Sequence, residues 1–253
     1  MNALSAYLDR VDPDRVILQR FLLLGLFLCL PLSLAVPMEW GWENGVVENA
    51  QVVVLLAGLF FAFQAWRHGP RGDASTLALC LLPVWLLLTG RELSWGSVFL
   101  DPLGFGPDGP IYSSRVLWYR PLVPPIAGLM LLGSLWLAWR QRLHRYLLRL
   151  VASGRFPWMS IFLVLGAALG STAGEGHLPA FAQHLLDHSL VLEEMSEAVG
   201  YLAMVVGQGI VLRYKAPATV TVHVAEAATA TTVESAAGNE VTAKAEARTE
   251  TVG

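Results

Sequence analysis

The sequence predicts an all-α protein, a polytopic transmembrane helix bundle of about six spans followed by a disordered C-terminal tail. The first observation is composition: of 253 residues, 55% are hydrophobic and only 15% charged, whereas soluble domains average about 25% charged residues. The second is that the apolar residues gather in runs close in length to the ~20 residues that a spanning helix needs. We therefore expect one bundle over residues 1–215 and a low-complexity tail over residues 216–253, rich in Ala, Thr, Val and Glu and without aromatic residues.

Six apolar runs are the candidate spans. They cover Phe21–Val36, Val46–Trp66, Ser75–Thr89, Leu122–Trp139, Pro157–Thr172 and Leu190–Leu212. The third run has an alternative end at Leu100. The first is either an uncleaved anchor or a signal peptide, with Ser33-Leu34-Ala35 as the cleavage site.

The arginine and lysine residues predict the orientation of the bundle. Most of them flank the first run or occupy the 2–3 loop, the 4–5 loop and the end of the sixth run, whereas the 1–2 and 5–6 loops have none. The positive-inside rule then places both termini in the cytoplasm, with the bundle in a bacterial cytoplasmic (inner) membrane. The lipid bilayer is the expected partner. Nucleic acid is excluded because the sequence has no large basic surface.

Two connecting segments also carry structural signals. The loop Asp101–Pro121 is rich in glycine and proline and predicts an irregular cap on the outer side. Arg142, Arg145 and Arg149 alternate with apolar residues, which predicts either an amphipathic basic helix on the inner membrane surface or an extension of the fourth span.

Ionisable side chains gather at the predicted outer ends of the spans. The group is Glu43, Glu48, Arg91, Glu92, Glu175, His177, His184, Asp187, His188, Glu193, Glu194 and Glu197. Ionisable groups at membrane depth are costly, so such a group is a functional-site hypothesis by default. Asn44, Glu48 and Gln51 share one helix face at the start of the second run, whereas Glu43 precedes them and is expected to be solvated.

Arg91 should have a carboxylate partner. Glu92 is adjacent in sequence and points to another face of the helix, so Glu48 or an acid of the sixth run is the better candidate. We expect Arg91, Glu92 and Glu197 to form a structural ion-pair group that ties helices together. Glu197 lies one turn deeper than Glu194 and begins an inward polar stripe with Tyr201 and Gln208.

The end of the third run carries a resemblance to a known group. Residues Glu92-Leu93-Ser94-Trp95-Gly96 resemble the Glu-Glu-Ile-Ser-Trp-Gly-Gln type motif of uncharacterised bacterial multi-pass membrane proteins. The chain departs from that motif at Arg91, in place of the first acid, and at Ser97, in place of glutamine. The resemblance implies a multi-pass fold with an acidic start to a late span, and it implies no activity.

A histidine pair precedes the sixth run. His184 and His188 are four residues apart, a spacing that places both imidazoles on one helix face and supplies half of a metal site. His177, Glu175, Glu194 or Glu48 would supply the third ligand, so the cofactor to consider is a divalent metal. The alternative is an interfacial helix with solvated imidazoles.

Two functions follow from this pattern. The first is an integral membrane protein whose His/Glu/Arg cluster binds a cation or protons at the outer face. The alternative is a membrane-embedded metal-dependent hydrolase or lipid-modifying enzyme, in which Glu48 or Glu194 activates water as a general base. A transporter should also show a polar path to the inner side, where the second and sixth runs offer only Gln64 and Gln208.

Overall fold

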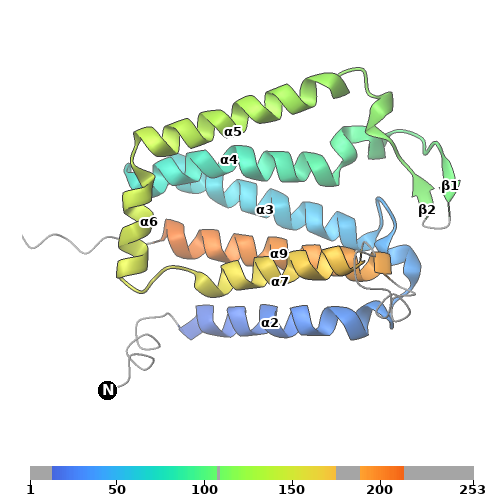
Figure 1. The fold of residues 1–253 in the computed structure, drawn as a ribbon, viewed down its shortest axis with the longest axis horizontal. Coiled ribbons are helices and arrows are strands. Elements are labelled where there is room, and N and C mark those ends of the chain that lie inside the picture. The colour runs from blue at the N-terminus through green and yellow to red at the C-terminus, as the bar shows by residue number, and fades with distance from the viewer. Residues whose placement is uncertain (1–12, 107–108, 175–188, 214–253) are drawn as a thin grey trace, which may run out of the picture. The chain divides into compact units, whose positions relative to one another are not determined.

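The computed structural model describes residues 13–106, 109–174 and 189–213. The chain divides into two units, Met1–Tyr214 and Lys215–Gly253, and all described residues belong to the first. The prediction of a mostly helical chain is confirmed, and the helices of the first unit lie side by side (Figure 1). The predicted disordered tail lies outside the described residues.

Each of the six apolar runs forms a helix. The helices are α2 (Pro13–Ser33), α3 (Val46–His68), α4 (Asp73–Glu92), α5 (Val123–Arg140), α6 (Leu143–Ala152), α7 (Trp158–Gly174) and α9 (Ser189–Leu212), of which α6 lies outside the runs. Four short 3-10 helices lie between them: η1 (Met38–Gly41), η2 (Ser94–Phe99), η3 (Ser114–Val116) and η4 (Arg120–Leu122). The loop at 101–121, expected to be irregular, contains two short strands, β1 (Gly104–Gly106) and β2 (Gly109–Ile111), which pair as an antiparallel hairpin.

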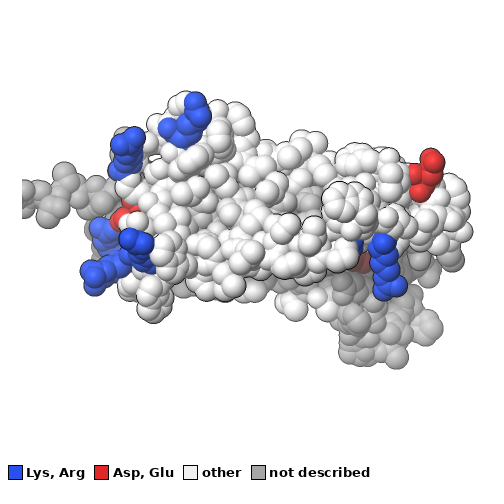
Figure 2. Space-filling view, turned by 90° about the horizontal axis from the view of Figure 1, so that it is seen from above, with Lys and Arg blue, Asp and Glu red and all other residues white. Residues whose placement is uncertain are grey.

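Several of these helices have the length and composition of membrane spans. Among the described residues, five are both long and apolar enough to cross a membrane, and α7 is a shorter apolar helix of 17 residues. Charged side chains lie at the two ends of the face drawn in Figure 2, and its middle is uncharged. We name the end where α3 begins, α4 ends and α9 begins the acidic end, and the opposite one the basic end.

Helix α9 is the centre of the bundle and packs against α2, α3, α4 and α7. Of the residues in its most apolar stretch, 39% are buried, compared with none in α5. Its Tyr201 joins Leu55 and Ala62 of α3 and Trp85 of α4 in one core cluster. Because α9 is surrounded by helices, its polar residues lie inside the bundle.

Small residues bring α7 and α9 close together. A Cβ atom added at Gly170 of α7 would lie 2.6 Å from Ser196 Oγ of α9, and one added at Gly207 of α9 would lie 3.1 Å from Ser160 Cβ of α7. Such contacts between small residues allow the close helix packing that is common in lipid, where apolar burial alone does not drive association.

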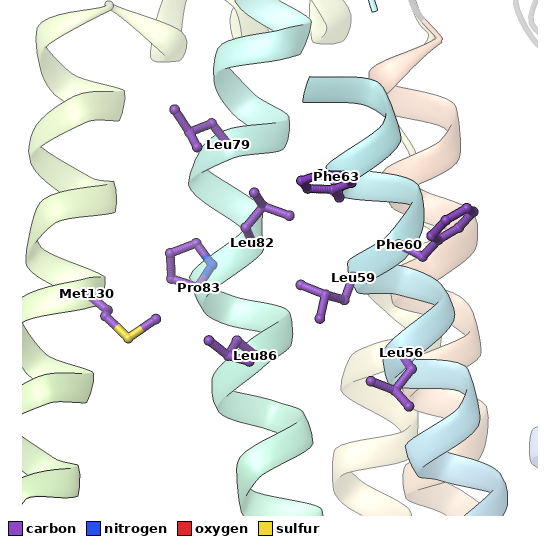
Figure 3. Close-up of a pocket in the computed structure, with 9 residues that line it drawn as sticks. All are labelled: Leu56, Leu59, Phe60, Phe63, Leu79, Leu82, Pro83, Leu86 and Met130. Atoms are coloured by element: carbon purple, nitrogen blue, oxygen red, sulfur yellow. The ribbon is translucent and has the colours of Figure 1, made fainter. Parts of the chain in front are cut away.

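Helix α5 packs on α4 and leaves an apolar groove beside it (Figure 3). The cavity measures about 540 Å³ and is lined by Leu56, Leu59, Phe60, Phe63, Leu79, Leu82, Pro83, Leu86 and Met130. Its walls carry no charged side chain, so hydrocarbon chains would solvate this surface well.

Helix α6 crosses the basic end of the bundle (Figure 1). The backbone of Arg142 adopts a positive φ of 54°, which breaks the chain direction between α5 and α6. Leu143, Tyr146 and Leu150 of α6 are buried, and the Tyr146 hydroxyl donates to the Val211 carbonyl at 2.7 Å. The basic segment is therefore a separate amphipathic helix and not an extension of α5.

Candidate functional site

A tight turn ends α4 directly after the two charged residues at its C-terminus. Ser94, Trp95 and Gly96 have positive φ values of 44°, 58° and 100°, which folds the Trp95 ring back over Gly90, where a Cβ atom would lie 2.8 Å from it. The Tyr119 hydroxyl donates to the Trp95 carbonyl at 2.6 Å. Residues 94–96 therefore build the turn that follows Arg91 and Glu92 at the acidic end.

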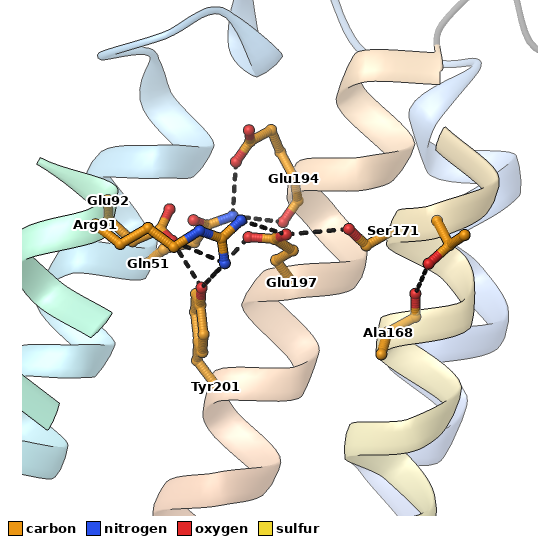
Figure 4. Close-up of polar contacts among 9 residues, drawn as sticks. Gln51, Arg91, Glu92, Ala168, Ser171, Glu194, Glu197 and Tyr201 are labelled. Atoms are coloured by element: carbon orange, nitrogen blue, oxygen red, sulfur yellow. Dashed lines mark hydrogen bonds and ion pairs between the residues drawn. The ribbon is translucent and has the colours of Figure 1, made fainter. Parts of the chain in front are cut away.

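Arg91 contacts three side chains at the α4–α9 boundary (Figure 4). Its Nη2 lies 3.1 Å from Glu197 Oε1, and its Nη1 lies 3.3 Å from the Tyr201 hydroxyl and 3.7 Å from Glu92 Oε1. The Tyr201 hydroxyl donates to Glu92 Oε1 at 2.7 Å. Glu197, and not Glu48, is thus the carboxylate from another helix that pairs with Arg91. The adjacent Glu92, which was expected to point to another face, also lies within ion-pair distance of Arg91 and accepts from Tyr201.

Glu197 links this group to α7. The Ser171 hydroxyl donates to Glu197 Oε1 at 3.0 Å, so one carboxylate of α9 receives contacts from α4 and from α7. Tyr201 and Gln208 are buried on α9 and the Glu197 side chain is only 13% exposed, which places the inward polar stripe inside the bundle.

Two further carboxylates belong to the α3 side of the site. The Gln51 amide Nε2 donates to the Glu194 carbonyl at 2.7 Å and to Glu194 Oε2 at 2.8 Å. Glu48 is buried and accepts from the backbone N–H of Asn44. The second acceptor atom of Gln51, Oε1, is buried and has no hydrogen-bond partner among the described residues.

The charges of the site are unequal. Glu48, Glu92, Glu194 and Glu197 lie within electrostatic range of one another, and the arginine among them is Arg91. We call these five residues together with Gln51 and Tyr201 the carboxylate cluster.

Glu43 has a role that the sequence did not predict. It was expected to be solvated in the loop, but its carboxylate accepts from the Ser94 hydroxyl at 2.6 Å and from the Tyr112 backbone N–H at 3.3 Å. It therefore joins the start of α3 to the turn after α4 and to the end of the hairpin. The only signal in the sequence for these contacts of Glu43 was its position near the other acids at the outer ends of the spans.

The predicted site residues divide into two sets. Glu48 and Glu194, the candidate general bases, and the ion-pair residues Arg91, Glu92 and Glu197 all lie in the carboxylate cluster. The candidate metal ligands His184, His188, His177 and Glu175 lie outside the described residues. Within the described part of the chain, no three His, Cys, Asp or Glu residues are arranged to hold a metal ion.

Fold and site together define a mostly helical protein with several apolar helices that could span a membrane and with ionisable residues gathered between them. Comparison with protein-family models, with curated proteins and with solved structures gives no match to the chain. The resemblance at residues 92–96 therefore stays a prediction, and the function has to be argued from the site.

Proposed function

We propose that this protein binds protons or a small cation in the carboxylate cluster, from the outer side of a bacterial inner membrane. The observation that carries the proposal is the excess of buried carboxylates over arginine among the described residues. Glu48 and Glu92 are buried, and Glu197 is nearly so, while Arg91 is the arginine that the described part of the chain contributes to the cluster.

Such an excess needs compensation. Removing an unpaired carboxylate from water costs several kcal/mol even after the protein relaxes, and Arg91 balances one of them. Protons or a bound cation would supply the remaining positive charge. Acids placed inside helical membrane proteins commonly serve as proton relays and ion sites for this reason.

The Oε1 atom of Gln51, which has no hydrogen-bond partner within the described part of the chain, is a second, independent observation that supports a bound positive group. Because both acceptors near Nε2 are oxygens of Glu194, the amide orientation is determined, and Oε1 points elsewhere as an acceptor. A buried acceptor without a partner costs about 1–3 kcal/mol. A proton donor or a cation beside it would remove that penalty.

The interior of the bundle favours binding from one side over passage through the membrane. Gln208, the polar residue nearest the basic end of α9, accepts from the Trp85 indole N–H and donates to the Gly58 carbonyl at 3.0 Å. Its amide is therefore engaged in joining α3, α4 and α9. Leu55 and Trp85, both buried, add apolar bulk to the same region.

The direct test is infrared spectroscopy of the detergent-purified protein, following the carbonyl band of protonated carboxyl groups at neutral pH. We expect a band that loses intensity in Glu48→Gln and in Glu194→Gln. Sodium or potassium titration that removes the band would identify a cation as the competing ligand. Glu39→Gln, at an exposed acid of η1, is the matched control. A spectrum without such a band, with or without added salt, would contradict the proposal.

The metal-dependent hydrolase or lipid-modifying enzyme remains the second candidate, because Arg91 and Glu197 line a groove with an apolar half. Glu48 or Glu194 would then act as the general base. Elemental mass spectrometry of the purified protein beside a His184→Ala/His188→Ala double variant tests it. Near-stoichiometric metal that disappears in the variant would favour this candidate and justify a screen of lipid substrates, and equal metal content in the two proteins would reject it.

A further inference from the structure

A second cavity opens beside Arg91, between α4 and α7 and above α9. It measures about 250 Å³ and is lined by Arg91, Val164, Ala167, Ala168, Ser171, Thr172, Glu197, Gly200, Tyr201 and Met204. We call it the α4/α7 groove. Sites for drug-sized ligands usually measure about 300–1,000 Å³, so this groove suits one part of a larger molecule.

The two halves of the groove differ in chemistry. Arg91, Glu197 and the hydroxyl residues of α7 line the half nearest the acidic end. Val164 of α7 and Met204 of α9 lie about two helical turns further toward the middle of the bundle. A ligand with a polar head at the membrane surface and an apolar part directed inward matches this order, and lipids have that form.

The polar half presents both signs of charge. The Arg91 side chain is 56% exposed and uses only Nη1 and Nη2 in its contacts with described residues, although a guanidinium carries five N–H donors. Glu197 Oε1 lies 3.1 Å from Arg91 Nη2. The nearby hydroxyl groups are occupied as donors, Ser171 toward Glu197 and Thr172 toward the Ala168 carbonyl at 2.8 Å. Arg91 is therefore the donor for an anionic group, and Glu197 the acceptor for a cationic one.

From this arrangement we propose that the α4/α7 groove binds a phospholipid with a phosphoethanolamine headgroup. The phosphate binds the Arg91 guanidinium, which suits phosphate oxygens through paired N–H donors. The ammonium group donates to Glu197, and the apolar part of the lipid lies against Val164, Ala168 and Met204. The headgroup contacts use Arg91 and Glu197 of the carboxylate cluster, and they do not involve Glu48 or Glu194, the two acids whose protonation is tested above.

Arg91 and Glu197 together make the groove selective among lipid headgroups. A phosphoglycerol headgroup has no cation for Glu197, and its net negative charge is repelled by that carboxylate. A phosphocholine headgroup has the cation but no N–H to donate. Because only phosphoethanolamine can add a charge-assisted hydrogen bond to Glu197, this lipid should bind at least about tenfold more tightly than either of the other two.

Native mass spectrometry of the delipidated full-length protein in detergent tests the proposal. Dioleoyl lipids with phosphoethanolamine, phosphoglycerol and phosphocholine headgroups are titrated separately. We expect Ala168→Trp, which fills the groove, to abolish the phosphoethanolamine preference. Leu169→Trp is the matched control, because Leu169 is the next residue on α7, is 73% exposed and does not line the groove.

Arg91→Gln should weaken phosphoethanolamine binding about tenfold if it remains folded, as judged by its thermal unfolding. The Ala168→Trp and Leu169→Trp pair decides the question if Arg91→Gln does not fold. Equal affinity for all three lipids, or a preference that survives Ala168→Trp, would overturn the proposal. The readout involves no proton measurement, so lipid binding and the carboxylate protonation proposed above succeed or fail separately.

Discussion

The Tyr201 hydroxyl occupies the centre of the carboxylate cluster. It accepts from Arg91 Nη1 at 3.3 Å and donates to Glu92 Oε1 at 2.7 Å. One hydroxyl thereby connects a cation and an anion of α4 to α9. A hydroxyl is suited to this position because it is both donor and acceptor. Removing it should leave Glu92 buried with one donor fewer.

Tyr201→Phe should therefore lower the free energy of unfolding by about 1–3 kcal/mol. The measurement is thermal or denaturant unfolding in detergent, as a double-mutant cycle with Glu92→Gln. The two effects should be non-additive by 0.5 kcal/mol or more, as is typical for residues in contact. Additive effects would show that the hydroxyl does not stabilise the Glu92 carboxylate.

A second residue-scale prediction concerns the turn after α4. Gly96 has a φ of 100°, and a Cβ atom there would lie 2.9 Å from the Tyr119 hydroxyl. Gly96→Ala should destabilise the protein by about 1–3 kcal/mol, the usual penalty for a non-glycine residue in a sparsely populated backbone region. Gly104→Ala is the control, since no atom lies within 4 Å of a Cβ atom built there. Equal unfolding temperatures for the two variants would refute this account of the turn.

At the scale of whole elements, Trp85 sets the distance between α3 and α4. Its ring is 2% exposed and lies against Gly58, and its indole N–H donates to Gln208 of α9. A Cβ atom at Gly58 would lie 2.7 Å from the ring. Three helices therefore meet at one tryptophan, and glycine is required where the ring touches α3.

Gly58→Val should destabilise the bundle by about 1–3 kcal/mol, because a filled core has no room for added carbon atoms. Gly128→Val on α5 is the matched control: it makes the same change inside an apolar helix, but no atom lies within 4 Å of a Cβ atom there. The measurement is unfolding in detergent of both variants. A control that is destabilised as strongly would attribute the effect to helix propensity instead of the contact with Trp85.

For the molecule as a whole, the proposed orientation makes the acidic end external. Cysteines introduced at Asn44 or Asp101 should react with a membrane-impermeant maleimide in intact cells, and a cysteine at Arg145 should react only after the membrane is permeabilised. All three positions are exposed, and the native Cys29 and Cys80 are buried, at 2% and 7% exposure, so background labelling should be low. The opposite labelling pattern would reverse the orientation and place the proposed site inside the cell.

Much of the fold could be predicted because hydropathy is a local property. The second apolar run was expected at Val46–Trp66, and α3 spans Val46–His68. The hairpin and the separate α6 were not resolved in advance. Both depend on turn conformations, such as the positive φ of Arg142. Many loop sequences tolerate these conformations, so the sequence does not specify where they occur. The sequence also placed the acids of the carboxylate cluster and Arg91 near one end of the bundle. The position of each residue along its apolar run gives its depth in the membrane.

By itself, the sequence determined the mostly helical fold, the approximate helix limits and the shared end at which the ionisable residues of the carboxylate cluster lie. These depend on composition and periodicity within single segments. The tertiary structure decided that Glu197 and not Glu48 pairs with Arg91, that Tyr201 bridges the pair, that Glu43 joins two loops, and that a groove opens between α4 and α7. Those facts depend on the rotation of each helix and on which helices are neighbours, and packing between distant segments sets both.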